Sequence, residues 1–122
     1  MPMRGLTIVV ASADEARLRS AAGLALSYQA LGGRVTLFLD TDAVASIAPP
    51  IAGAQDARFA AGGMPTLADL VEEVLAVEIK VMLCQAGMAM AGLDADTLDP
   101  RLSYGGMIGL LADLGDDRLV TV

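Results

Sequence analysis

The chain has 122 residues, which suits a single domain with one hydrophobic core. Apolar residues make up 55% of it but aromatic residues only 3%, so the core must be aliphatic and few rings are present for stacking nucleic-acid bases. Fifteen acidic against eight basic residues give a net charge of −7, which repels nucleic acids and anionic membrane surfaces, so we expect neither partner.

Membrane insertion is also disfavoured by the distribution of apolar residues. A spanning helix needs about 18 nearly uncharged residues, and Pro49-Pro50 and Gln85 each interrupt a shorter apolar stretch. The start of the chain does not combine the parts of a signal peptide. A lone cysteine, Cys84, cannot form an internal disulfide, as is usual in a reducing compartment, so we expect a cytoplasmic protein.

The first forty residues predict a βαβ unit. Residues 6–11 form a short apolar run with β-branched side chains, which is typical of a strand buried on both faces. Ser12 and Glu15 have the spacing of a capping box, which predicts a helix that runs to about residue 31. Residues 35–39 predict a second buried strand, parallel to the first and reached by a right-handed crossover.

The middle of the chain is less regular. Residues 41–48 predict a short helix, and the stretch up to Pro65 predicts a partly irregular excursion that contains a strand around residues 58–61. Thr66 is placed to cap a helix whose apolar side chains share one face.

The last third of the chain predicts two further strands. Residues 79–83 form an apolar strand that passes through Cys84 into a short helix ending near Gly92. A loop over residues 94–103, a helix over about 105–114 and a strand over 119–122 complete the chain. These elements predict one α/β domain over residues 1–122, with three α/β/α layers and four to five mostly parallel strands.

Several classes of catalytic site are excluded by residues that the chain lacks. Without histidine there is no Ser/His/Asp or Cys/His pair and no zinc site of His and Cys. No glycine loop matches a phosphate-binding pattern, so we predict no nucleotide cofactor. Asp94, Asp96 and Asp99 are close in sequence, but acidic loops are usually solvated, so we predict no metal site.

Cys84 is the candidate that remains. Sulfane-sulfur transfer needs only a thiolate that attacks a sulfur–sulfur bond, so it requires no general base. The N–H groups of residues 85–87 favour the thiolate if they open a helix, and Lys80 or Arg101 would add positive charge if the fold brings either close. The alternative is that Cys84 is a packed thiol, because free cysteine is among the most buried residue types.

The stretch around Cys84 resembles a known family. The sequence KVMLCQAGMAMAGL from Lys80 to Leu93, followed by Leu98 and Tyr104-Gly105-Gly106, is similar to the cysteine region of the DsrE/DsrF-like sulfur-trafficking proteins. The resemblance implies a flavodoxin-like fold, a persulfide on Cys84, and homo- or hetero-oligomers, commonly trimers or hexamers. Gly87 departs from the family pattern, which often has Ser or Thr there, and Ala89 stands where an acidic residue is frequent.

Two functions follow as expectations. The first is a small sulfur carrier or sulfurtransferase that exchanges sulfane sulfur through Cys84 with a protein thiol or a small sulfane-sulfur compound. The second is a non-catalytic oligomeric or small-ligand-binding module of the same fold, with Cys84 as a packed thiol. A mean hydropathy of +0.59 favours a homo-oligomer in either case. We expect the substrate to contact residues near Cys84 and at the end of the first strand: Gln85, Ala86, Gly87, Met88 and Ser12.

Overall fold

The computed structural model describes residues 3–122 and contains one five-stranded sheet. All four pairings between neighbouring strands are parallel, and the strands lie in the order β4-β3-β2-β1-β5. The predicted α/β class is therefore confirmed, although this order differs from the 2-1-3-4-5 order of flavodoxin. The strands are β1 (Leu6–Val10), β2 (Val35–Leu39), β3 (Lys80–Cys84), β4 (Ser103–Gly105) and β5 (Arg118–Thr121).

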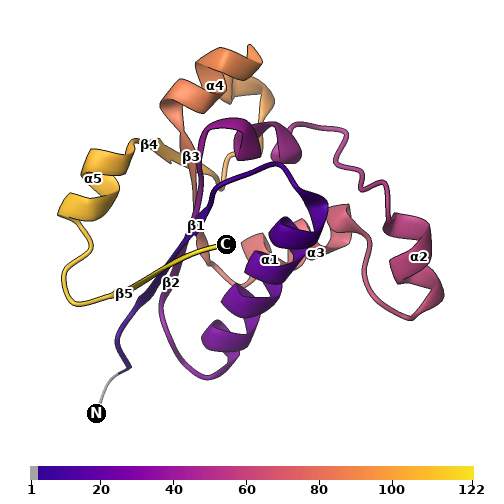
Figure 1. Ribbon diagram of the computed structural model, residues 1–122, viewed down its shortest axis with the longest axis horizontal. Coiled ribbons are helices and arrows are strands. Elements are labelled where there is room, and N and C mark those ends of the chain that lie inside the picture. Colours follow the sequence, from indigo (N-terminus) through magenta and orange to yellow (C-terminus); the bar gives the residue numbers. More distant parts are fainter. Residues whose placement is uncertain (1–2) are drawn as a thin grey trace.

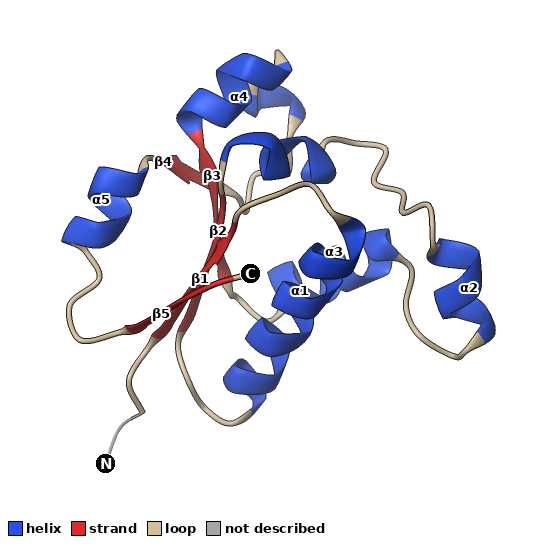
Figure 2. Ribbon diagram, in the orientation of Figure 1, coloured by secondary structure: helices blue, strands red, loops and turns tan. Residues whose placement is uncertain are grey.

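The helices cover the two faces of the sheet unequally (Figure 1). Helices α1 (Glu15–Ala30) and α3 (Leu67–Ala76) lie on one face, and α5 (Met107–Ala112) lies on the other. Helix α4 (Gln85–Ala91) lies beyond the end of β3, and α2 (Asp56–Ala61) stands away from the sheet on the α1 side (Figure 2). Two short 3-10 helices, η1 (Thr41–Ile47) and η2 (Ala95–Thr97), complete the chain.

The handedness of the crossovers explains this unequal cover. From β1 to β4 the chain moves across the sheet in one direction, so right-handed connections place their helices on the same face. The connection from β4 to β5 runs back across the sheet, so its helix, α5, lies on the opposite face. One face is thus covered by two long helices, and the other, which we call the α5 face, by a helix of six residues.

Alternation along the strands decides which side chains lie on each face. Leu37, Leu39 and Val81 pack with apolar side chains of α1 and α3. Thr36 and Met82 lie on the other face with Leu110 of α5. Cys84 follows Met82 by two residues, so it belongs to the α5 face.

The predicted capping box at the start of α1 is wrong. Asp14 is the N-cap, and its carboxylate accepts a hydrogen bond from the Arg17 N–H at 2.9 Å. The Ser12 hydroxyl accepts from the Asp14 N–H at 3.3 Å, and Ser12 lies two residues before the N-cap, too early to cap the helix. Glu15 does not reach back to Ser12, because its carboxylate binds the Arg19 guanidinium at 2.9 Å.

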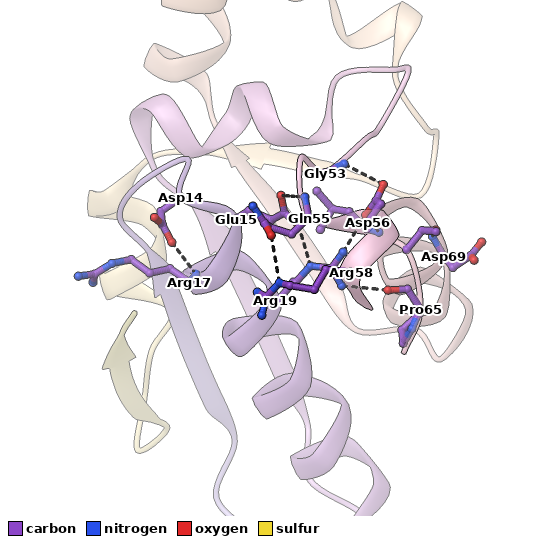
Figure 3. Close-up of polar contacts among 12 residues, drawn as sticks. Asp14, Glu15, Arg17, Arg19, Gly53, Gln55, Asp56, Arg58, Pro65 and Asp69 are labelled. Carbon is purple, nitrogen blue, oxygen red and sulfur yellow. Dashed lines mark hydrogen bonds and ion pairs between the residues drawn. The ribbon is translucent and has the colours of Figure 1, made fainter. Parts of the chain in front are cut away.

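The strand predicted around residues 58–61 is also wrong, because these residues belong to helix α2. Arg19, which is 8% exposed, holds this region to α1 (Figure 3). Its guanidinium pairs with Asp56 at 2.7 Å, donates to the Pro65 carbonyl at 2.9 Å and lies 3.8 Å from the centre of the Phe59 ring. The alanine-rich sequence of α2 favours a helix, and the contacts of Arg19 with Asp56 and Phe59 hold this helix in place.

Asp56 also organises the excursion that contains α2. Its carboxylate accepts the N–H groups of Gly53 at 2.9 Å and Leu67 at 2.8 Å (Figure 3). These backbone hydrogen bonds, followed by the charge of Arg19, lower the pKa of Asp56 from its ordinary value. One carboxylate thus ties the start of the excursion to the start of α3.

A second difference in the strands concerns β4. Residues 94–103 were expected to form a loop and a helix was expected from residue 105, but Ser103–Gly105 pairs with β3 before α5 begins at Met107. A strand of three half-buried residues is too short to display a period of two, so β4 has no sequence signal.

Among residues 3–122, no helix combines the length and apolarity needed to cross a bilayer.

Candidate functional site at the end of β3

Cys84 is both the last residue of β3 and the N-cap of α4. Its backbone keeps extended dihedral angles, and its Sγ accepts the N–H of Gly87 at 3.5 Å, as a capping oxygen does in other helices. The residue is 7% exposed, so the sulfur is largely enclosed. The predicted placement of Cys84 where a strand meets a helix is confirmed.

The connections that leave β3 and β4 place Cys84 at a topological switch point. Helix α4 follows β3 and packs against η1 on the α1 side, whereas β4 leads to α5 on the other face. Cys84 and Gly105 are register partners at the ends of these two strands. In open α/β sheets, ligands bind outside the carboxyl ends of strands where neighbouring connections diverge. The geometry therefore makes this end of the sheet the candidate site.

Gly87 is required by the close approach of α4 to η1. A Cβ placed on Gly87 would overlap the Thr41 carbonyl oxygen and would lie 2.9 Å from Val44 Cγ2 and 3.0 Å from Thr41 Cα. Thr41 itself has a φ of +38°, an uncommon conformation for a β-branched residue. No hydroxyl-bearing side chain fits at position 87 in this packing, which explains the departure from the family pattern at Gly87.

Gly105 leaves space that a methionine fills. A Cβ on Gly105 would lie 2.8 Å from Sδ of Met82 and 3.4 Å from its Cε. The thioether of Met82 therefore extends over the backbone of Gly105, the register partner of Cys84. On the α5 face, the Met82 side chain reaches the level of Cys84 along β3.

The fold brings neither candidate cation to the thiol. Lys80 begins β3, four residues and about 13 Å along the strand from Cys84. Arg101 binds Glu72 at 2.7 Å and Asp99 at 2.8 Å, and it lines a hollow together with Lys80 at the amino end of β3. The Arg101 hydrogen bond lowers the pKa of Asp99 to about 2. One backbone N–H group, that of Gly87, contacts the sulfur in place of a side-chain cation.

The other predicted site residues divide into two groups. Gln85 and Ala86 are exposed in the first turn of α4, and Met88 is buried at 7% exposure, so these residues lie beside Cys84. Ser12 follows β1, which β2 separates from β3, and its hydroxyl is bound to the Asp14 N–H. A hollow of about 440 Å³ nearby is lined by residues of the loop after β1, of η1 and of α4: Ala13, Thr41, Asp42, Ala45, Gly87, Met90 and Ala91.

Thr41 was missed by the sequence reasoning, and the reach of Met82 was not foreseen. A positive φ in a threonine leaves no trace in the sequence, whereas the two-residue spacing of Met82 and Cys84 indicates a shared face once β3 is recognised. Within residues 3–122, no group of three or more Asp, Glu, Cys or His residues is arranged to bind a metal ion.

Comparisons with known proteins agree with this fold. The model of the DsrE/DsrF-like family matches residues 4–122. Among solved structures, the ychN protein of E. coli superposes with a TM-score of 0.75 at 19% identity, covering 98% of this chain and 100% of that one. A protein of unknown function from Methanobacterium thermoautotrophicum, MTH1491, gives 0.74 at 11% identity with the same coverage. No curated protein matches the sequence. Because the family model spans essentially the whole sequence, the chain belongs to the DsrE/DsrF-like family.

Proposed function

We propose that the protein is a sulfur carrier or sulfurtransferase that holds sulfane sulfur as a persulfide on Cys84. The observation that carries the proposal is the position of this thiol, at the switch point of the sheet, with the N–H of Gly87 directed at its sulfur. A hydrogen bond from an N–H group stabilises negative charge on the attacking sulfur. Membership of the DsrE/DsrF-like family points to a role in sulfur relay and supports the same conclusion.

The chemical step requires no general base once the thiolate has formed. The Cys84 thiolate attacks the terminal sulfur of a hydropolysulfide anion, and a new sulfur–sulfur bond forms while the adjoining one breaks. Cys84 becomes a hydropersulfide, the proton stays on the transferred sulfur, and the dianion of a chain one sulfur shorter leaves. No external oxidant is consumed, since the sulfur arrives already in the sulfane state.

The test is the intact mass of the protein after incubation with sodium polysulfide and removal of excess reagent. We expect added sulfur that a thiol reductant removes and that Cys84→Ser abolishes. The serine variant is a matched control, because its hydroxyl can still accept the Gly87 N–H and cap α4. An unchanged mass for folded wild-type protein would rule out the carrier.

The 7% exposure of Cys84 favours a second function, a binding module in which the thiol only packs. The rate of native thiol labelling separates the two proposals. Reaction with a small thiol reagent in the native state supports the carrier, whereas reaction only after denaturation supports the packed thiol.

A homo-oligomer, a trimer or hexamer, is part of the proposal. Helix α5 has no polar side chain, and its outer surface leaves Ile108 at 88% and Leu111 at 47% exposure. A helix that is apolar all round is normally buried, so a second copy is proposed to cover this surface. We also propose the cytoplasm as the location, on the ground that the lone cysteine suits a reducing compartment.

A further inference from the structure

A cavity of about 490 Å³ lies between α5 and the sheet. Leu110 of α5 and Leu114 in the turn after this helix line one side, and Thr7, Thr36 and Met82 from three neighbouring strands line the other. The loops before β2 and β3 also contribute lining residues, so the cavity opens toward the amino ends of these strands. This cavity is on the α5 face, the same face as Cys84.

The part of the cavity formed by the sheet is polar near the mouth and apolar toward Cys84. The strand register places Thr7 beside Thr36, and Thr36 beside Lys80. Thr7 is only 3% exposed, and no hydrogen bond of its hydroxyl is found within residues 3–122, so this hydroxyl is available to a bound molecule. Beyond this row the next lining residue along β3 is Met82.

Met82 stands between the cavity and the thiol. It lines the cavity, and its thioether lies over Gly105, the register partner of Cys84. On the opposite side, α4 and η1 approach so closely that no Cβ fits at Gly87. Methionine has three rotatable bonds and adapts to irregular spaces, so the Met82 side chain can swing aside without movement of the backbone.

We propose that the cavity beneath α5 is the route by which a small sulfane-sulfur compound reaches Cys84, and that Met82 is its gate. The identity of this ligand rests on the proposed function, whereas the route does not. Because the route passes beneath a helix, it admits a small molecule and excludes a thiol on the surface of a folded protein.

The lining suits a short chain of sulfur atoms with one negative charge. The Lys80 ammonium and the hydroxyls of Thr7 and Thr36 match the anionic end, and the Met82 thioether matches the polarizable sulfur atoms. Two carboxylates, Glu78 and Asp113, also line the cavity, so the anionic end of the ligand must lie against the Lys80 ammonium and away from them. The third, Asp117, is neutralised by Arg34 through hydrogen bonds of 2.8 and 2.9 Å.

The experiment measures the rate at which methyl methanethiosulfonate, a small uncharged thiol reagent, labels Cys84 in the folded protein. If the open gate is a minor state, Met82→Ala raises the rate by about tenfold or more. Adding Thr36→Phe fills the cavity and returns the rate toward that of wild type. Leu70→Ala, in α3 on the other face, is the control for general loosening and leaves the rate unchanged.

Two single variants keep the test decisive if Met82→Ala does not fold. Thr36→Phe alone must slow the labelling of wild-type protein, and Met90→Trp, in the hollow beside Gly87, must not. If Met90→Trp slows the labelling and Thr36→Phe does not, the reagent enters at the carboxyl ends of the strands and the proposal is overturned. Equal acceleration of labelling by Met82→Ala and Leu70→Ala would also overturn it. Methyl methanethiosulfonate reacts with any accessible thiol, so its labelling rate tests the route alone. If Met82→Ala raises this rate but polysulfide adds no sulfur to Cys84, the proposed function is refuted and the route is still supported.

Discussion

Replacing Gly87 with alanine tests whether packing at the start of α4 fixes this residue. The added methyl group would overlap the Thr41 carbonyl oxygen and approach Val44 Cγ2 to 2.9 Å. Both Thr41 contacts are with backbone, which cannot rotate away as a side chain does, so α4 and η1 must separate. Overpacking of this kind costs about 3 kcal/mol, against about 1 kcal/mol gained because alanine favours a helix. We expect a net loss of about 2 kcal/mol in the free energy of unfolding.

The matched control is Gly23→Ala, in the middle of α1. No atom lies within 4 Å of a Cβ placed on Gly23, so the same substitution carries only the helix-propensity gain of about 1 kcal/mol. The two variants should therefore change stability in opposite directions. Urea denaturation followed by circular dichroism measures both, and thermal unfolding should show a Tm lower by roughly 6–12 °C for Gly87→Ala.

Equal or greater stability of Gly87→Ala would refute the close approach of α4 to η1, and with it the explanation of Gly87. Gly87→Ser adds the hydroxyl that the family pattern often carries, but its Cβ meets the same atoms. We expect it to be destabilised like Gly87→Ala and to load no more sulfur than wild type.

Three other predictions concern acid sensitivity, the oligomer and the excursion that contains α2. Asp99 has its pKa lowered to about 2 and Asp117 is also lowered, so the stability that they contribute is present above their ordinary value of 3.8 and is lost as the pH falls through the lowered values. Urea midpoints should fall over this range and fall less in Asp99→Asn; equal acid sensitivity of the variant would contradict the assignment. Ile108→Glu should lower the oligomer mass in sedimentation equilibrium while Leu31→Glu, at another exposed apolar residue that is not in α5, leaves it unchanged; no change for Ile108→Glu would exclude α5 from the interface. Arg19→Met removes the cation that binds α2 to α1, so limited proteolysis within residues 48–66 should accelerate, and unchanged cleavage would show that other contacts hold the excursion.

The elements with strong periodicity could be predicted from the sequence, and the exceptions have identifiable causes. Strands β1, β2 and β3 are mostly apolar runs, as expected of strands with helices on both faces, and only Thr7, Thr36 and Lys80 interrupt them. Helix α2 was mistaken for a strand although its alanine-rich sequence favours a helix, and its contacts with Arg19 join segments far apart in the sequence. Strand β4 is too short to show any period. The sparse cover of the α5 face follows from crossover handedness, but only once the strand order is known.

The candidate site was predictable only where it is contiguous in sequence. Cys84 and the first turn of α4 are neighbours along the chain, so their association needs no tertiary information. The contact of Thr41 with Gly87 and the reach of Met82 over Gly105 join separate elements, so neither could be read from local patterns. Ser12 was included because it ends the first strand, but β2 lies between that strand and β3.

The most direct test of the central claim is to locate transferred sulfur on one peptide. Trypsin cleaves after Lys80 and Arg101 and releases residues 81–101, which contain the single cysteine of the chain. After treatment of the folded protein with polysulfide and alkylation, mass spectrometry should find this peptide with an alkylated persulfide on Cys84. Recovery of the peptide with only an alkylated thiol, from protein whose Cys84 reacts with methyl methanethiosulfonate, would contradict the account.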